Sequence, residues 1–208
     1  MTFAQLIKKV EKRVRYESPE LRYRIKDFIN EAILEFMDIR DWAELVKSAN
    51  LTTDDSGSYT LASIVGSDYF YGTVGNNPLI RDGKNDTEKY FRRTSYQQYI
   101  NATPKTRLWA INQKSLYIDG TGQDLTLFYL TPGEEYPMSA DDDTNLVTEN
   151  YADIIEQATI VKFHIWEGDN DMAGIENSVL NNKIKLRKSK ELRDDKKGQM
   201  FRVGYANR

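Results

Sequence analysis

His164 is the only histidine in this chain of 208 residues, and histidine is the side-chain type that most readily exchanges protons near neutral pH. Acid–base catalysis would require a nucleophile or a carboxylate held beside it, and no pattern in the sequence supplies one. A structural role late in a helix is therefore the favoured interpretation. The absence of cysteine excludes disulfides, thiolate metal sites and a cysteine nucleophile.

Carboxylates are plentiful, but their spacing does not identify a site. The segment Asp119–Asp124 (DGTGQD) superficially resembles a calcium loop, yet it lacks the repeated aspartates and the distant glutamate of an EF-hand. Its glycines lie between two alternating segments, which indicates a hairpin turn. The triplet Asp141–Asp143, with Glu134, Glu135 and Glu149 nearby, is expected to be a solvated loop. No metal and no cofactor are therefore predicted.

Basic and aromatic residues are interleaved in the middle of the chain, as in sheets that bind single-stranded nucleic acid. The same mixture suits a protein interface. The formal net charge of −3 provides no net positive field for a polyanion, so a protein interface is favoured. The residues concerned are Arg92, Arg93, Lys105 and Arg107, among Tyr90, Phe91, Tyr96, Tyr99 and Trp109.

The usual catalytic and phosphate-binding motifs, GxGxxG, the P-loop, HExxH and GxSxG, are not found, so the chain is not expected to be an enzyme. Two alternatives stay open at this point. One is a glycan-acting hydrolase, because paired carboxylates without a fixed spacing are compatible with 32 acidic residues. The other is a nucleic-acid-binding β-module that uses Arg92, Arg93 and Tyr90.

The first elements expected are two helices. Apolar residues recur at helical spacing from Phe3 to about Arg15, and again for roughly 20 residues after Pro19. Ser18 is a suitable N-cap, and proline fits the first position of a helix because its missing N–H costs nothing there. The short connection predicts that the two helices are antiparallel neighbours.

From Leu51 to Thr131 the residue types and the turn clusters are typical of β-structure. About six short strands at this spacing predict a small sandwich or barrel-like sheet. The candidate strands are Tyr59–Leu61, Tyr69–Tyr71, Lys89–Phe91, Arg107–Ile111, Leu116–Ile118 and Leu125–Tyr129.

A loop is expected from Thr131 to Glu149, followed by a helix from about Tyr151 to Glu167 with Ile165 and Trp166 facing inward. Gly168 stops this helix, and another is expected from about Met172 to near Lys190. The last apolar residues follow a charged stretch and are interpreted as an extended arm that docks on a partner; a frayed tail or a return onto its own sheet is the alternative. The candidate partner-binding residues are Met200, Phe201, Val203 and Tyr205, together with Trp42.

The sequence thus predicts an α+β protein. An antiparallel helical bundle, made of an N-terminal and a C-terminal helix pair, is expected to hold an inserted small antiparallel β-sandwich or barrel-like module. The bundle is assigned to residues 1–50 and 145–195, the β-module to residues 51–144 and a C-terminal arm to residues 196–208. No run of residues approaches the roughly 18 apolar positions that a membrane span requires, so no membrane contact is expected.

Three segments together resemble the head–tail adaptor proteins of short-tailed bacteriophages, the tail-tubular or SU10-type adaptors. The first is INEAILEFMDIRDWAELV, Ile29–Val46, in which a helix ends in an Arg-Asp-Trp exit. The second is the strand–turn–strand region Thr106–Pro137. The third is Asn145–Arg193, in which a loop leads into two helices. The order and spacing of many weak signals carry the resemblance.

The resemblance implies a structural role and no reaction. Such proteins form a ring, usually dodecameric, between the portal protein and the next tail component, a nozzle or tail-tube protein. DNA passes through the lumen without specific binding, so the lumen is not expected to be strongly basic. A C-terminal segment often reaches toward the portal. The implied location is the head–tail interface of the virion, after assembly in the cytoplasm of the bacterial host.

Overall fold

A computed structural model describes residues 1–15, 18–74, 91–105, 108–118, 122 and 124–203, with side chains described up to residue 192. Internal contacts divide the chain into two compact units. Met1–Asp38 and Pro137–Arg208 form one of them, called here the helical unit, and Ile39–Tyr136 form the other, called the sheet unit. The chain is thus a mixed α+β protein, as predicted, and its described strands form two sheets.

The helical unit begins with two capped helices, α1 (Phe3–Val14) and α2 (Pro19–Asp38). Thr2 and Gln5 form a reciprocal capping box at the start of α1. The Ser18 hydroxyl accepts a hydrogen bond from the backbone N–H of Leu21 at 3.1 Å, so the predicted cap of α2 is confirmed. One face of each helix is buried, which places their apolar stripes against the rest of the unit.

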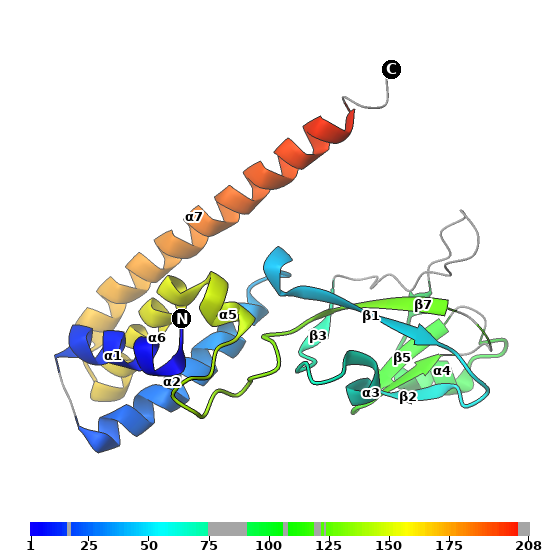
Figure 1. Ribbon diagram of the computed structural model, residues 1–208, viewed down its shortest axis with the longest axis horizontal. Helices are drawn as coiled ribbons and strands as arrows, with labels where there is room; N and C mark the ends of the chain where they lie inside the picture. Colours follow the sequence, from blue (N-terminus) through cyan, green and yellow to red (C-terminus); the bar gives the residue numbers. More distant parts are fainter. Residues whose placement is uncertain (16–17, 75–90, 106–107, 119–121, 123, 204–208) are drawn as a thin grey trace. The chain divides into compact units, whose positions relative to one another are not determined.

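The second part of the helical unit consists of α5 (Leu146–Asn150), α6 (Ala152–Glu167) and α7 (Asn170–Val203). Helix α6 packs against α1, α2 and α7, so it is the central helix of this unit. Figure 1 shows that α7 runs on past the other helices of the unit. Asp169 caps α7, because its carboxylate accepts from the Met172 N–H at 3.0 Å.

The sheet unit contains two sheets. The first has the order β1-β7-β3 and the second the order β2-β6-β5-β4. The unit also contains two short helices and a 3₁₀ turn, Ala43–Leu45, before the first strand. The strands are β1 (Val46–Thr52), β2 (Ser58–Thr60), β3 (Gly72–Thr73), β4 (Arg92–Arg93), β5 (Leu108–Asn112), β6 (Ser115–Ile118) and β7 (Asp124–Leu130), and the helices are α3 (Leu61–Val65) and α4 (Tyr96–Asn101).

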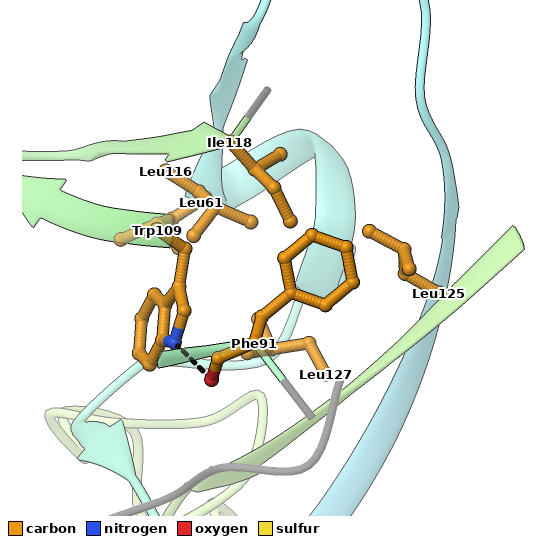
Figure 2. Close-up of a cluster of buried hydrophobic side chains, with 7 residues drawn as sticks. All are labelled: Leu61, Phe91, Trp109, Leu116, Ile118, Leu125 and Leu127. Atoms are coloured by element: carbon orange, nitrogen blue, oxygen red, sulfur yellow. Dashed lines mark hydrogen bonds between the residues drawn. The ribbon is translucent and has the colours of Figure 1, made fainter. Parts of the chain in front are cut away.

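Side chains from both sheets meet in one buried cluster (Figure 2). The strands β5, β6 and β7 and the helix α3 all contribute to it, and the Trp109 indole N–H donates to the Phe91 carbonyl at 3.1 Å. Burying an indole is favourable only when its N–H has a partner, and this bond provides one. The cluster consists of Leu61, Phe91, Trp109, Leu116, Ile118, Leu125 and Leu127.

The expectation of a purely antiparallel module is wrong at one pairing. Strand β4 runs parallel to β5, with Arg92 opposite Leu108. Parallel neighbours require a crossover connection, and the segment between these strands carries the helix α4. The sandwich or barrel form stays a prediction.

Several strand boundaries also differ from those expected. Residues 46–50, expected to belong to the helical bundle, are part of β1, which pairs with β7 along its whole length. Leu61 begins the short helix α3 rather than ending a strand. Tyr69–Tyr71 precedes β3 and is not itself a strand. Of Lys89–Phe91, the first two residues lie outside the described part of the chain, as does Arg107.

The last helix is longer than expected. It continues from Asn170 to Val203, so the prediction of an extended backbone is wrong for residues 196–203. The charged run before them is mostly lysine, arginine, leucine and glutamate, which favour a helix and let it continue. Ile165 and Trp166 were expected to face inward but are 58% and 50% exposed. Among the described residues, no helix is long and apolar enough to cross a membrane.

Candidate partner-binding surfaces

His164 lies near the end of α6, as predicted. Its backbone carbonyl accepts from the N–H groups of Gly168 and Asp169, which close the helix end. Its ring is edge-on to Phe163, with ring centres 5.4 Å apart. The ring atom Nδ1 is buried and has no hydrogen-bond partner within the described ranges. This arrangement places His164 at a helix terminus, and none of the described side chains forms a hydrogen bond or an ion pair with its ring.

The acidic loop is tied to the helices beside it. The backbone carbonyls of Asp143 and Asp141 accept from the N–H groups of Phe3 and Ala4, both at 2.9 Å, and so satisfy the free start of α1. The Asp141 carboxylate lies 3.4 Å from the Lys26 ammonium. Within the described ranges, no group of three or more potential ligands is placed to hold a metal ion.

Of the segment Asp119–Asp124, the structure describes only Gly122 and Asp124. Gly122 has a left-handed backbone with φ of 69°, which suits the predicted turn. Its N–H donates to the Thr53 carbonyl at 2.7 Å.

Two basic residues of the basic and aromatic cluster, Arg93 and Lys105, lie over aromatic rings of the same unit. Arg93 lies over the ring of the fully buried Trp109 at 5.5 Å and donates to the Thr73 hydroxyl at 3.1 Å. Lys105 lies 5.0 Å from the ring centre of Tyr99. Nucleic-acid bases require open aromatic faces on which to stack. Tyr99 and Trp109 are buried, so this arrangement favours a protein contact; Tyr90 and Arg107 lie outside the described residues.

A polar cluster that the sequence did not indicate lies in the same unit. The Asp68 carboxylate accepts from the Tyr129 hydroxyl at 2.6 Å and from the Lys47 ammonium at 2.9 Å. Burial, followed by the hydrogen bond to Asp68, raises the pKa of Tyr129. The cluster joins the loop before β3 to β1 and β7, which is a structural task. Three single residues far apart in sequence give no local signal for it.

The predicted partner-binding residues fall into two groups. Met200, Phe201 and Val203 lie at the end of α7, where the structure describes the backbone only. Tyr205 lies outside the described residues. Trp42 is 0% exposed and carries the Arg40 guanidinium over its ring at 5.3 Å. In the chain by itself Trp42 is a packing residue, and its contact with a partner stays a prediction.

The clearest surface feature is an apolar stripe on α7, called here the α7 stripe. It consists of Met172, Ile175, Val179 and Leu186, which are 37%, 58%, 40% and 71% exposed. Their spacing of three, four and seven residues places them on one side of the helix. The sequence shows that these residues are apolar. Its periodicity does not tell which apolar residues of the helix pack inside the chain and which remain exposed.

The family model described as SU10 adaptor protein matches residues 1–197. A search of curated proteins finds no match to the sequence. The matched span includes every described helix and strand except the end of α7. The chain therefore belongs to the SU10 adaptor protein family, and it is a structural adaptor protein of a bacteriophage.

Proposed function

We propose that this chain is the head–tail adaptor of a virion, which joins the portal protein to the tail and forms part of the DNA channel. Membership of the SU10 adaptor family supports the class. The observation that carries the portal contact is the α7 stripe, because four neighbouring apolar side chains are exposed on a helix of 34 residues. Apolar side chains exposed along one side of a helix are typical of a binding site.

The proposed partner of the α7 stripe is the portal protein. A helix of this length extends about 50 Å at 1.5 Å per residue, so it can reach well beyond the unit from which it starts. An apolar helix side is recognised by a groove that accepts side chains three and four residues apart. Met200, Phe201, Val203 and Tyr205 extend the same contact at the far end of the chain. Trp42 supports the protein by internal packing.

The sheet unit is the proposed contact with the next tail component, a nozzle or tail-tube protein. Tyr96 and Tyr117 are half buried, with ring centres 4.7 Å apart, and the exposed Arg92 lies on β4, the strand that precedes α4. Half-exposed tyrosines and arginines are enriched at protein interfaces. The functional protein is a homo-oligomer, a dodecameric ring in the virion, that is assembled in the host cytoplasm.

The proposed role is not enzymatic. Two carboxylates of the acidic loop are engaged: Asp143 accepts from two backbone N–H groups, and Asp141 pairs with Arg22 and Lys26. DNA passes the ring without specific binding. The chain is slightly acidic overall, which leaves little long-range attraction for a polyanion.

The test is to place charges in the α7 stripe. The double variant Ile175→Asp and Leu186→Asp is expected to bind the purified portal at least about tenfold more weakly, because both carboxylates would lose water at an apolar contact. Its helical circular dichroism and melting temperature should match those of the wild type, since both positions are exposed.

The matched control is Asn177→Asp with Asn181→Asp, which adds the same charge to exposed positions of the same helix outside the stripe. Portal binding by the control should be within about twofold of wild type. If the stripe variant binds the portal as tightly as the wild type does, the proposed contact between the α7 stripe and the portal is refuted. Infectious particles formed without any copy of this protein would refute the adaptor function as a whole.

A further inference from the structure

Helix α1 presents a basic face. Gln5, Lys8, Lys9 and Lys12 are exposed on one side of the helix and, with Met1, line a shallow cleft of about 640 Å³. The Lys9 ammonium lies 3.9 Å from the Glu156 carboxylate of α6. Within the described ranges, no carboxylate lies within ion-pair distance of Lys8 or Lys12. This group is called the α1 basic face.

Helix α2 presents an acidic face. Glu20, Asp27, Glu31 and Glu35 are exposed and follow each other at helical spacing, with Arg24 as a cation on the same row. Glu31 and Glu35 share one counter-ion, Lys162 of α6, at 3.2 and 2.6 Å. Asp27 has no ion pair within the described ranges. This group is called the α2 acidic face.

Both faces carry like charges at four-residue spacing, which destabilises a helix unless an opposite charge lies nearby. Lys8 and Lys12 are one such pair and Asp27 and Glu31 are another, whereas Glu31 and Glu35 already share Lys162. Because both faces repeat every four residues, about 6 Å along the axis, two lysines of one face can lie opposite two carboxylates of the other. The faces are therefore complementary in sign and in spacing.

The two faces do not neutralise each other inside one chain. The ion pair that joins α1 to α2 is between Glu11 and Arg22, at 3.7 Å, and Glu11 is buried. No ion pair in the described part of the chain connects Lys8 or Lys12 with Asp27 or Glu31. Every copy carries both faces on its helical unit. A second copy therefore offers an acidic face to the basic face of the first, and a basic face to its acidic face.

We propose that neighbouring copies of this chain bind head to tail, the α1 basic face of one copy against the α2 acidic face of the next. Such a contact joins two different surfaces and therefore continues from copy to copy until a ring closes. The inference rests on the proposed function only in taking the working protein to be a homo-oligomer. Beyond that function, the inference names the two helices that form the contact between copies. It also makes charge complementarity the property by which one copy recognises the next.

The first test reverses each face separately. Lys8→Glu with Lys12→Glu keeps the Lys9–Glu156 pair, and Asp27→Lys with Glu31→Lys keeps the Glu35–Lys162 pair. Sedimentation velocity should show self-association of the wild type at about 0.02 M salt that is lost at about 0.5 M, because salt screens such contacts. Each reversed variant should associate at least about a hundredfold more weakly, since like charges then face each other.

A one-to-one mixture of the two variants should restore association to the wild-type level, because every contact in an alternating ring is again between opposite charges. The control, Lys185→Glu with Lys190→Glu, changes the net charge as much as Lys8→Glu with Lys12→Glu does, but on exposed positions of α7, and it should associate like the wild type. A wild type that stays monomeric at low salt, or a mixture that does not associate, would overturn the proposal.

The second test uses cross-linking, because the chain has no cysteine of its own. Lys12→Cys and Glu31→Cys in one chain should give, on oxidation, a ladder that continues beyond the dimer. A ladder that stops at the dimer would show a closed two-fold contact instead, and dimers from Lys12→Cys alone would show that α1 pairs with α1. Either result contradicts head-to-tail binding.

The two proposals fail separately. Charge reversal on α1 or α2 leaves the α7 stripe intact, so each variant should still bind a portal as a single copy. The variants of the α7 stripe should still self-associate. A variant that loses portal binding but still self-associates tests the α7 stripe alone. A variant that loses self-association but still binds the portal tests the charged faces alone.

Discussion

Helices α6 and α7 follow each other directly, but their relation to the rest of the helical unit differs. Helix α6 buries seven of its 16 side chains and contacts the four helices α1, α2, α5 and α7. In α7, which is twice as long, only Ala173 and Glu191 are buried among the side chains described. The internal packing of the unit therefore accounts for α6, whereas α7 has most of its surface free for contacts with other molecules.

The ends of the two helices show the same contrast. Gly168 closes α6 with a left-handed backbone, φ of 80°. The first turns of α7 are held by Glu176, which accepts from Gln157 and Arg13. Farther along, Arg187 lies over the ring of Tyr151 at 4.7 Å. Helix α7 is thus attached to the unit along one side and leaves the stripe unoccupied.

The largest expected difference between the two helices comes from removing one large side chain, first from α6 and then from α7. Phe163→Ala, at a position 1% exposed, should lower the free energy of unfolding by about 3–5 kcal/mol, because it removes buried area and leaves a cavity. Leu186→Ala on α7, at a position 71% exposed, should change it by no more than about 0.5 kcal/mol. Urea unfolding followed by helical circular dichroism measures both. Equal losses would mean that the stripe is part of the core.

A smaller effect is expected from the two glycines on either side of the junction. Gly168→Ala should destabilise the protein by about 1–2 kcal/mol, because a side chain disfavours positive φ. Gly174→Ala should stabilise it by about 0.5–1 kcal/mol, since this glycine is inside a helix and nothing lies within 4 Å of the added methyl group. Thermal unfolding compares the two. Stabilisation by Gly168→Ala would show that the junction between the helices does not need the left-handed turn.

The smallest effect depends on pH. Burial lowers the pKa of Lys162, but the hydrogen bonds and charges of Glu35 and Glu31 outweigh burial and raise it above its ordinary value of 10.5. A raised pKa stabilises the folded protein fully below the ordinary value, and this stability is lost as pH rises through the folded-state value. Lys162→Gln should therefore cost at most about 1 kcal/mol at neutral pH, since both glutamates are largely exposed.

The difference in stability between Lys162→Gln and the wild type should close as pH rises above 10.5. The control is Lys190→Gln at an exposed position of α7, which should follow the wild type at every pH. Urea midpoints measured at pH values below and above 10.5 give the comparison. A difference that does not depend on pH would show that Lys162 contributes through its methylene chain rather than its charge.

The sequence predicted the elements that carry their own local signals. Ser18 and Pro19 mark the start of α2, and alternating residues mark β6 and β7. The family resemblance drawn from weak signals along the chain is confirmed by the match over residues 1–197. These elements are specified by neighbours in the sequence, which is why they are readable from it.

Other features depend on partners far away in the chain. Strand β1 (VKSANLT) has few apolar residues, and its place is set by pairing with β7, more than 70 residues later. The parallel pairing of β4 with β5 is a property of the connection, which no period in the sequence reveals. On α7, apolar residues lie on the inner and outer sides, so the pattern gives a helix without showing which side is free.

The helical unit is made of two stretches of chain, and this has a consequence for synthesis on the ribosome. The N–H groups of Phe3 and Ala4 are satisfied by residues 141 and 143, and Arg13 binds Glu176. Helices α1 and α2 therefore leave the ribosome about 100 residues before the chain that covers them, an interval of about 5–20 s at 5–20 residues per second. During that time the sheet unit, which is continuous, can complete its fold, while the apolar sides of α1 and α2 remain open to chaperones.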